Sequence, residues 1–319
     1  MSEQLPVSAI QRLVSKPAGP LGFGTGFLHH VGDRGEAVRL LRQAFDAGIT
    51  YFDTARLYGE GICEGLLGEA FAGQRDRIVI ATKVGILPPG RDLAKRAVGK
   101  AASLARKIGP LRAVVPEPAI RYPMFGVFDV PRMRTSFETS LRELKTDHVD
   151  LLLLHECTAA DVANSDVTGF LDTLVQEGKV RAWGVAPRDV DMIEIDRSGT
   201  AYGDVTQFAD AIRGEVPAQS APALVVTHSC LGSSFQETLS RLKTDSGLAA
   251  RWGEAVGMDV SDPAALAKLF LARAMQRNPD GVVLFSTTRA DRLGPNLEAV
   301  GLLASLDVVS AFSGLLEAV

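Results

Sequence analysis

Short apolar runs, each ending in polar residues or glycine, recur along the 319-residue chain, and segments with helical periodicity separate most of them. In residues 36–47, for example, the apolar side chains share one helical face, and Gly48 follows where a left-handed helix end is expected. The apolar runs occupy residues 21–24, 49–53, 78–83, 149–155, 179–186, 205–208, 224–227 and 281–285. Eight strands alternating with helices at this length are typical of an α/β fold of the closed (β/α)8 or TIM-barrel class.

A parallel sheet is indicated by the fourth run, residues 149–155, in which the leucines at 151–154 follow one another without polar interruption. Strands of parallel sheets are covered on both faces and read as continuously apolar, whereas half-exposed antiparallel strands alternate. Periodicity does not show whether the sheet closes, so an open, doubly wound sheet is the alternative architecture. With 46% hydrophobic and 23% charged residues, the chain can bury a large core, and we expect residues 1–319 to form a single domain.

Two connections are too long for simple strand-to-helix turns: residues 84–130 after the third strand, and residues 228–262 after the seventh. In a barrel, long βα loops lie at the C-terminal face, where functional sites are built. The first insertion is basic, with the cations Arg91, Lys95, Arg96, Lys100, Arg106, Lys107, Arg112 and Arg121. A solvated helical excursion is the simpler interpretation of this insertion. A basic lid that favours an anionic substrate or coenzyme phosphates is the alternative.

Three polar residues end consecutive apolar runs: Asp53 ends the second, Lys83 the third and His155 the fourth. Tyr58 follows Asp53 in the loop beyond the second strand. Each residue alone has a structural explanation, such as helix capping for the Asp or solvent exposure for the Lys. Because the carboxyl ends of parallel strands meet at one face of a barrel, we expect the four side chains to converge there.

Together these four side chains would form a unit suited to proton transfer. A phenol has a pKa of about 10 and is a weak acid at neutral pH. The Lys83 ammonium is expected to lower the pKa of Tyr58, and the Asp53 carboxylate would hold Lys83 in place. His155 could donate a hydrogen bond to a carbonyl oxygen and orient it, so that Tyr58 protonates this oxygen as negative charge develops.

The segments around these residues resemble the aldo-keto reductase family. They are 22–26 (GFGTG), 52–59 (FDTARLYG), Glu64, 67–68 (LG), 81–83 (ATK), 149–155 (VDLLLLH), 178–184 (GKVRAWG), 206–207 (TQ), 229–232 (SCLG), 286–289 (STTR) and Asn296. The resemblance spans most of the chain outside the two insertions. It implies an enzyme that interconverts a carbonyl compound (an aldehyde, a ketone or an aldose) and an alcohol by direct hydride transfer, without a metal. It also implies that Tyr58 is the general acid and base, that Asp53 and Lys83 tune it, and that His155 orients the substrate.

The coenzyme implied by the resemblance is NADP(H), extended across the barrel mouth, with NAD(H) as the alternative. The residues expected to contact it are Gly24, Thr25, Gln207, His228, Ser229, Leu231, Ser286, Thr287, Arg289, Arg292 and Asn296. Among them, Gln207 would contact the nicotinamide carboxamide, and Arg292, with Arg289 as a second candidate, would contact a 2′-phosphate. The family lacks the usual dinucleotide-binding glycine motif, so the glycines at 22–26 are interpreted as the loop of the first strand.

Several positions on the coenzyme side depart from the family's pattern. Ala186 and Pro187 replace a Ser-Asn pair and cannot offer the same side-chain hydrogen bonds to the carboxamide. His228 replaces a tyrosine that stacks on the nicotinamide, and an imidazole offers a smaller stacking surface. Pro295 replaces a glutamate, and Ser286 replaces a lysine near the 2′-phosphate. These departures predict weaker coenzyme binding or a relaxed preference between NADP(H) and NAD(H).

Bulk properties exclude several other classes of protein. A net charge of −4 provides no overall attraction to nucleic acid or to an anionic membrane. The chain has no apolar run of the roughly 20 residues that a membrane helix needs, and no signal-peptide pattern at its start. We therefore expect a cytoplasmic protein whose partner is a small carbonyl or sugar substrate; no feature indicates an oligomeric state. Cys63, Cys157 and Cys230 lack any CxxC pattern, which indicates buried, reduced thiols and not a zinc site.

Two functional classes are compatible with the sequence, and a third is disfavoured. The first is a carbonyl reductase or alcohol dehydrogenase that uses the four strand-end residues. The second is a coenzyme-binding sensor or regulatory subunit with vestigial catalysis, although a sensor needs no proton donor. The third is a metal-dependent hydrolase, which would need several histidines and carboxylates at strand ends, where only His155 and His228 qualify.

Overall fold

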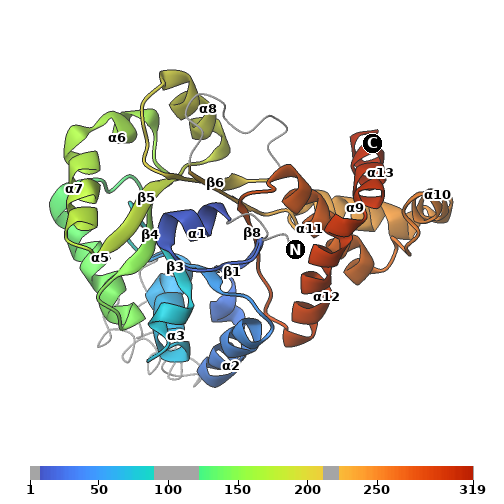
Figure 1. Ribbon diagram of the computed structural model, residues 1–319, viewed down its shortest axis with the longest axis horizontal. Coiled ribbons are helices and arrows are strands. Elements are labelled where there is room, and N and C mark those ends of the chain that lie inside the picture. Colours follow the sequence, from blue (N-terminus) through green and yellow to red (C-terminus); the bar gives the residue numbers. More distant parts are fainter. Residues whose placement is uncertain (1–7, 90–121, 211–222, 319) are drawn as a thin grey trace, which may run out of the picture.

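Eight parallel strands form a closed barrel in the computed structural model, which describes residues 8–89, 122–210 and 223–318 (Figure 1). Each strand pairs with its sequence neighbours, and β1 pairs with β8 to close the sheet. The strands are β1 (Leu21–Gly24), β2 (Tyr51–Asp53), β3 (Val79–Val84), β4 (Val149–His155), β5 (Val180–Ala186), β6 (Val205–Ala209), β7 (Leu224–His228) and β8 (Val282–Phe285). The predicted (β/α)8 barrel is therefore confirmed, and the open-sheet alternative is wrong.

Helices surround the barrel and extend beyond it on the side of the C-terminal residues (Figure 1). In the described residues the α-helices are α1 (Ala9–Val14), α2 (Arg34–Asp46), α3 (Ile62–Ala70), α5 (Val130–Leu144), α6 (Ala159–Ala163), α7 (Ser165–Gln176), α8 (Asp189–Ser198), α9 (Ser233–Thr244), α10 (Ser246–Val256), α11 (Pro263–Arg277), α12 (Leu293–Leu297) and α13 (Leu306–Glu317). Short 3-10 helices are η1 (Leu28–His30), η2 (Tyr58–Gly61), η3 (Arg75–Arg77), η5 (Ala290–Arg292) and η6 (Glu298–Ala304).

The helix ends follow chemistry that is visible in the sequence. Asp129 caps α5 by accepting a hydrogen bond from the backbone N–H of Arg132, and Pro131 lies in the first turn, as expected. Gly48 and Gly178, after α2 and α7, have φ values of 103° and 69°. Glycine adopts this left-handed region without strain, so both residues end their helices as predicted.

The two long connections differ from each other. Residues 90–121 lie outside the described part of the chain, and with them all the cations on which the basic-lid hypothesis depends. The described ends of this insertion lie side by side, because Leu87 and Met124 form an antiparallel bridge. Residues 228–262, in contrast, do not form an open loop, since α9 and α10 occupy most of them.

The barrel interior is filled by side chains from alternate strand positions. They include Tyr51, Val79, Leu151, Leu153, Ala182, Val205, Leu224, Val226 and Val282. Helix α1 packs Ala9, Ile10 and Val14 against the same cluster and so covers the N-terminal end of the barrel. The interior is therefore a packed core and not a channel, as expected for eight strands.

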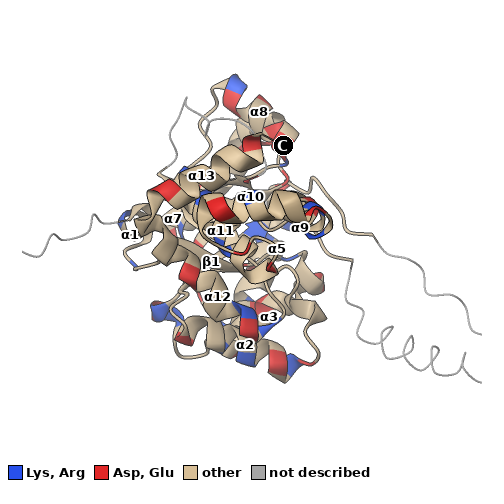
Figure 2. Ribbon diagram, turned by 90° about the vertical axis from the view of Figure 1, so that its right-hand side faces the viewer, with Lys and Arg blue, Asp and Glu red and all other residues tan. Residues whose placement is uncertain are grey.

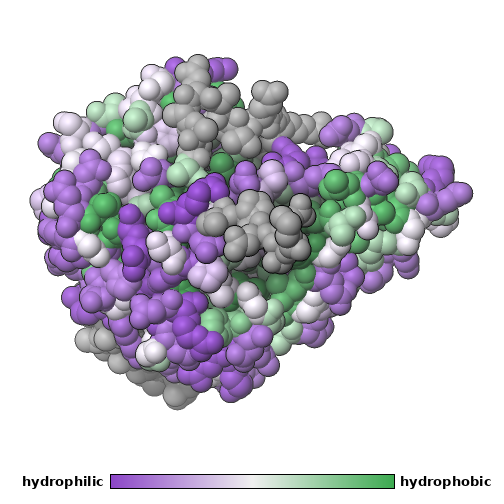
Figure 3. Space-filling model, viewed as in Figure 1, coloured by the Kyte–Doolittle hydropathy of each residue, from purple (hydrophilic) through white to green (hydrophobic). Residues whose placement is uncertain are grey.

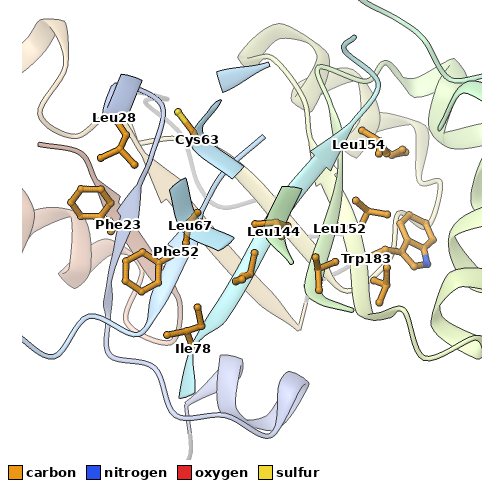
Figure 4. Packing of buried hydrophobic residues seen from close by; sticks show 14 of the residues in the cluster. Phe23, Leu28, Phe52, Cys63, Leu67, Ile78, Leu144, Leu152, Leu154 and Trp183 are labelled. Atoms are coloured by element: carbon orange, nitrogen blue, oxygen red, sulfur yellow. The ribbon is translucent and has the colours of Figure 1, made fainter. Parts of the chain in front are cut away.

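A larger apolar layer lies between the outer faces of the strands and the helices (Figure 4). Phe23 of β1 and Phe52 of β2 contact each other with ring centroids 6.2 Å apart. Leu67 of α3, Leu144 of α5 and Leu152 of β4 belong to the same cluster, and each is at most 3% exposed. Because both faces of the strands are tightly packed, the polar residues at the strand ends have little freedom to shift.

The C-terminal helices form a third apolar cluster beside the barrel. Phe235, Trp252, Phe270 and Phe312 meet there edge to face, with ring centroids 5.2 to 6.1 Å apart. Hydrophobic residues gather over these helices on the surface (Figure 3), while acidic and basic residues are interspersed on helices such as α2 and α3 (Figure 2).

Among the described residues, no single helix is long and apolar enough to span a membrane. Residues Ala290–Ala304 and Leu306–Glu317 reach that length and apolar composition only when they are taken together, and the chain bends by 106° between them.

One buried carboxylate gathers several segments near the N-terminal end of the barrel. Asp150, in β4, is fully buried and lies 2.9 Å from Lys16 Nζ and 2.6 Å from Arg75 Nη2. Arg181 of β5 approaches it at 3.3 Å, and the backbone N–H of Ile80 donates a hydrogen bond to it. The segment before β1, the turn before β3, and strands β4 and β5 therefore depend on one side chain.

We expect Asp150→Asn to lower the free energy of unfolding by about 3–5 kcal/mol, because it leaves partly buried cations without their counter-charge. Urea denaturation followed by circular dichroism measures this change. Asp147→Asn is the matched control, since the Asp147 side chain is 95% exposed, and we expect it to leave stability unchanged. Equal stability of the Asp150 variant and the wild type would show that the cation cluster adds nothing net.

Candidate active site

The C-terminal mouth of the barrel receives one inward-pointing position from each strand. Alternation along the strands places these positions at Gly24, Asp53, Lys83, His155, Ala186, Gln207, His228 and Ser286. All of them line one cavity of about 960 Å³, and Tyr58 of η2 lines it as well. The four candidate catalytic residues are therefore brought together, in a cavity large enough for a coenzyme fragment and a small substrate.

Lys83 is buried and held by Asp53. Its Nζ donates hydrogen bonds to the two carboxylate oxygens of Asp53, at 2.7 and 2.6 Å, and to the carbonyl oxygen of Thr54 at 3.0 Å. Tyr58 Oη lies 3.5 Å from the same Nζ. In the sheet Asp53 pairs with Ala81, which lies two residues before Lys83 in β3. The Lys83 side chain therefore starts beyond the end of β2 and extends towards Tyr58.

Lys83 favours the Tyr58 phenolate as expected, but the expected net lowering of the Tyr58 pKa is wrong. The pKa of Tyr58 is raised and not lowered, because burial of the phenol outweighs the opposing field of the Lys83 ammonium, and the Asp53 carboxylate raises it further. Burial also disfavours the charge on Lys83, but Asp53 and Tyr58 together hold the pKa of Lys83 above its usual value. The resting site therefore contains a protonated phenol beside a charged ammonium, which is the state that a general acid requires.

His155 completes this group from the end of β4. Its ring is perpendicular to that of Tyr58, with centroids 6.1 Å apart. Burial lowers the pKa of His155 to about 3, and Lys83 and His228 act in the same direction. At neutral pH the imidazole is therefore uncharged, with one N–H donor and one nitrogen acceptor. Such a donor can orient a carbonyl oxygen beside the Tyr58 hydroxyl.

Gln207 carries an unused acceptor on the wall of the cavity. Its amide nitrogen donates to Asp53 Oδ2 at 3.2 Å, whereas its buried Oε1 has no hydrogen-bond partner among the described residues. Buried polar atoms without partners are rare in folded proteins. Gln207 can therefore accept a hydrogen bond from an amide N–H group of a bound ligand.

Residues that follow β7 form another part of the wall. His228 Nδ1 lies 2.8 Å from Ser229 Oγ. Burial lowers the pKa of His228; Asp53 opposes this shift and Lys83 adds to it. Ser229 has a φ of 65°, a left-handed conformation that costs energy for a residue other than glycine. Leu231 lines the cavity beyond them, so this wall offers a neutral imidazole, a hydroxyl and an apolar contact.

The remaining residues of the predicted coenzyme set do not line this cavity. They are Thr25, Thr287, Arg289, Arg292 and Asn296. Thr25 and Asn296 are buried, whereas both arginines are exposed. The Arg289 guanidinium is engaged by Asp291, with Nε and Oδ1 3.0 Å apart. Contact of these residues with a coenzyme stays a prediction.

Several other residues line the cavity although their residue types did not predict it. Phe27, 62% exposed, follows β1, and Glu156 follows His155 with a φ of 52°. Arg188, Asp189 and Val190 lie just beyond β5 and line the cavity as well. Their position shortly after a strand end could have predicted that they line the cavity, because the segments that follow the strands form the barrel mouth.

Cys63, Cys157 and Cys230 are buried, as predicted, and none of the three forms a disulfide. Burial raises the pKa of both Cys157 and Cys230 to about 12, so neither is a thiolate at neutral pH. Within the described ranges, no three His, Cys, Asp or Glu side chains are grouped closely enough to hold a metal ion.

The neutral state of buried His155 predicts a pH dependence of stability. Between about pH 6.5 and 5 the unfolded histidine binds a proton while the folded one, with a pKa of about 3, does not. The free energy of unfolding should therefore fall as pH falls, with a contribution from this site of at most about 1.4 kcal/mol per pH unit. Urea unfolding at several pH values should show a smaller slope for His155→Gln than for wild type. Exposed His30→Gln is the control, and equal slopes in all three proteins would contradict a neutral buried imidazole.

Comparison with known proteins agrees with this fold. The methylglyoxal reductase YeaE of Escherichia coli is 29% identical over 184 residues, which span 57% of this chain and only 50% of that protein. Probable aldo-keto reductase 1 of Glycine max is 26% identical over 317 residues, covering 89% of this chain and 82% of that protein. The crystal structure of an aldo-keto reductase from Klebsiella pneumoniae in complex with NADPH superposes with a TM-score of 0.59 and 23% identity, covering 91% of this chain and 90% of that chain. The sequence model of the aldo/keto reductase family matches residues 20–200, more than half of the chain, so the protein belongs to the aldo/keto reductase family.

Proposed function

We propose that this chain is a nicotinamide-dependent oxidoreductase that interconverts a carbonyl compound and an alcohol. The observation that carries the proposal is the buried Lys83 ammonium, which Asp53 holds at 2.6 Å while Tyr58 Oη lies 3.5 Å away. Ionisable groups with perturbed pKa values in a cavity are typical of catalytic sites. The relative named methylglyoxal reductase supports a carbonyl substrate.

In the proposed reduction Tyr58 is the general acid. Its protonated phenol donates to the carbonyl oxygen as negative charge develops there, and in the oxidation the phenolate accepts the proton of the alcohol. Lys83 stabilises the phenolate left behind, and Asp53 keeps Lys83 charged and in place. The N–H group of neutral His155 holds the carbonyl oxygen in position.

When bound, a nicotinamide coenzyme supplies or accepts the hydride at the carbonyl carbon. The residues present fit such a group, because Gln207 has a free buried acceptor suited to a carboxamide and His228 presents a flat neutral ring. Ser229 and Leu231 would line its further course. We propose NADP(H), with NAD(H) as the alternative, and the Klebsiella pneumoniae protein was crystallised with NADPH.

A second candidate function is a coenzyme-binding sensor or regulatory subunit with vestigial catalysis. It is favoured by Ala186 and Pro187, which line the cavity where the family pattern places hydrogen-bonding side chains. The hydrogen-bonded contacts of Lys83 with Asp53 and Tyr58 favour catalysis, because a sensor has no use for a proton donor.

We further propose that residues 1–319 act as one domain.

Tyr58→Phe should lower kcat by about 10²- to 10⁴-fold, because it removes the proton donor and keeps the ring. Consumption of NADPH with a panel of aldehydes, ketones and aldoses, methylglyoxal included, measures the rate. Coenzyme binding, followed by fluorescence, should stay unchanged because the hydroxyl is directed at the substrate. Equal inactivity of wild type and variant, with NADPH still bound, would contradict the oxidoreductase and support the sensor.

The state of Arg289 predicts a relaxed coenzyme preference. Asp291 already engages its guanidinium, and Ser286 replaces the lysine of the family pattern, so a 2′-phosphate would gain little at either of these two positions. Dissociation constants for NADPH and NADH should therefore lie within about tenfold of each other. Asp291→Asn should free Arg289 and tighten NADPH binding by up to about fivefold, with NADH unaffected. Tight NADPH binding without measurable NADH binding to the wild type would contradict this prediction.

A further inference from the structure

The turn that carries Tyr58 has a strained backbone. Gly59, Glu60 and Gly61 follow the tyrosine with φ values of 56°, 56° and 80°. Such a conformation costs energy at Glu60, which is not glycine, and it persists only where the surroundings enforce it. A Cβ atom added to Gly59 would lie 2.7 Å from His29 Cβ, so the turn is also closely packed. The position of Tyr58 therefore depends on contacts that hold this turn and not on a regular helix or strand.

A buried ion pair holds this turn from the adjacent helix. Arg56, in the loop between Asp53 and Tyr58, places Nη1 2.8 Å from Glu64 Oε2 on α3. The Glu64 side chain is fully buried, and that of Arg56 is only 11% exposed. At Gly61 a Cβ atom would collide with the guanidinium, so the glycine makes room for this pair.

The same carboxylate also reaches the strand that carries the catalytic lysine. Glu64 Oε1 accepts a hydrogen bond from Thr82 Oγ1 at 2.8 Å, in a contact that is buried. Thr82 precedes Lys83 in β3, and successive side chains of a strand point to opposite faces. Glu64 therefore joins the loop of Tyr58 to the strand of Lys83 from outside the barrel, while the two reactive side chains meet inside it.

Helix α3 offers a second Arg–Glu pair for comparison. Arg34 Nε lies 2.6 Å from Glu69 Oε2, but these side chains are 56% and 39% exposed. Exposed ion pairs contribute little to structure, whereas a buried carboxylate with two fixed donors defines the position of both. The hydrogen bonds of Arg34 go to Glu69 and to the carbonyl oxygen of Gly65, so this pair serves as the matched control.

We propose that Arg56 and Glu64 are positioning residues, whose buried ion pair holds the strained turn so that Tyr58 Oη remains 3.5 Å from Lys83 Nζ. Neither side chain lines the cavity, so the pair acts through Tyr58 and not on the substrate. This inference rests on the proposed function, in which Tyr58 and Lys83 act together. Displacement of a reacting group by about 1 Å can lower a rate on the order of 10²-fold.

The first test compares Arg56→Ala with Arg34→Ala in the full chain. For Arg56→Ala we expect kcat to fall on the order of 10²-fold, with KM and the NADPH dissociation constant unchanged. Added guanidinium ion should restore part of kcat, and Arg56→Lys should lie between wild type and Arg56→Ala because lysine lacks the planar fork. The Arg34→Ala control should keep wild-type kcat and show no response to guanidinium.

The second test does not depend on turnover. In protein labelled with ¹³C-tyrosine, the Tyr58 signal is assigned by its absence in Tyr58→Phe. We expect this signal to shift or broaden in Arg56→Ala and to stay in place in Arg34→Ala. Thr82→Val removes one hydrogen bond to Glu64 at similar volume, so it keeps the test informative if Arg56→Ala does not fold. It should move the same signal and lower kcat by about fivefold.

Each outcome decides between the proposals. A wild-type kcat and an unmoved Tyr58 signal in both Arg56→Ala and Thr82→Val would overturn the inference. A parallel loss of kcat, coenzyme binding and general signal dispersion, without rescue by guanidinium, would also overturn it and assign the pair a purely structural role. Failure of the proposed function can be distinguished from failure of this inference. If the proposed function is wrong, Tyr58→Phe will keep its activity or the wild type will have none. The Tyr58 signal reports on the ion pair in either case.

Discussion

Closure of the barrel is the constraint on which the rest of this structure depends. Each strand pairs with its neighbour until β8 meets β1, and alternation then directs every second side chain towards the axis. The axis is filled by apolar side chains over most of its length and covered by α1 at its N-terminal end. At the other end the same inward positions are mostly polar, so residues distant in the chain meet there. Ser286 Oγ, for instance, donates a hydrogen bond to the carbonyl oxygen of Gly24 at 2.8 Å.

Three buried carboxylates organise the charged groups around this core, each in a different way. Asp150 is surrounded by lysine and arginine side chains near the N-terminal end, where it holds segments together. Glu64 is shared between Arg56 and Thr82 outside the barrel, beside the turn of Tyr58. Asp53 has the Lys83 ammonium and the Gln207 amide as partners and faces the cavity. A buried charge needs partners wherever it lies, and at the mouth those partners also face a space in which a ligand can bind.

Burial also sets the protonation states that the proposed chemistry uses. The same desolvation that raises the pKa of Tyr58 lowers that of His155, because in each case it disfavours the charged form. Lys83 is the exception, since burial disfavours its charge but Asp53 and Tyr58 together hold its pKa above the usual value. The site therefore combines a neutral acid, a neutral hydrogen-bond donor and one ammonium–carboxylate pair, which suits a carbonyl oxygen that becomes negative only during the reaction.

The sequence by itself determined the alternation of eight strands with helices and the convergence of Asp53, Lys83 and His155, because apolar runs and helical periodicity are local patterns and parallel strands end at one face. Closure of the sheet into a barrel was decided only by the tertiary structure, because the pairing of β8 with β1 joins the two ends of the sheet. The direction of the Tyr58 pKa shift was decided only by the tertiary structure, since burial and the Lys83 field oppose each other and their balance depends on packing. The same holds for the Arg56–Glu64–Thr82 contacts, for the pairing of Arg289 with Asp291, and for the cations around Asp150. No periodicity marks such contacts in advance, because each depends on distances and desolvation that exist only once the chain has folded.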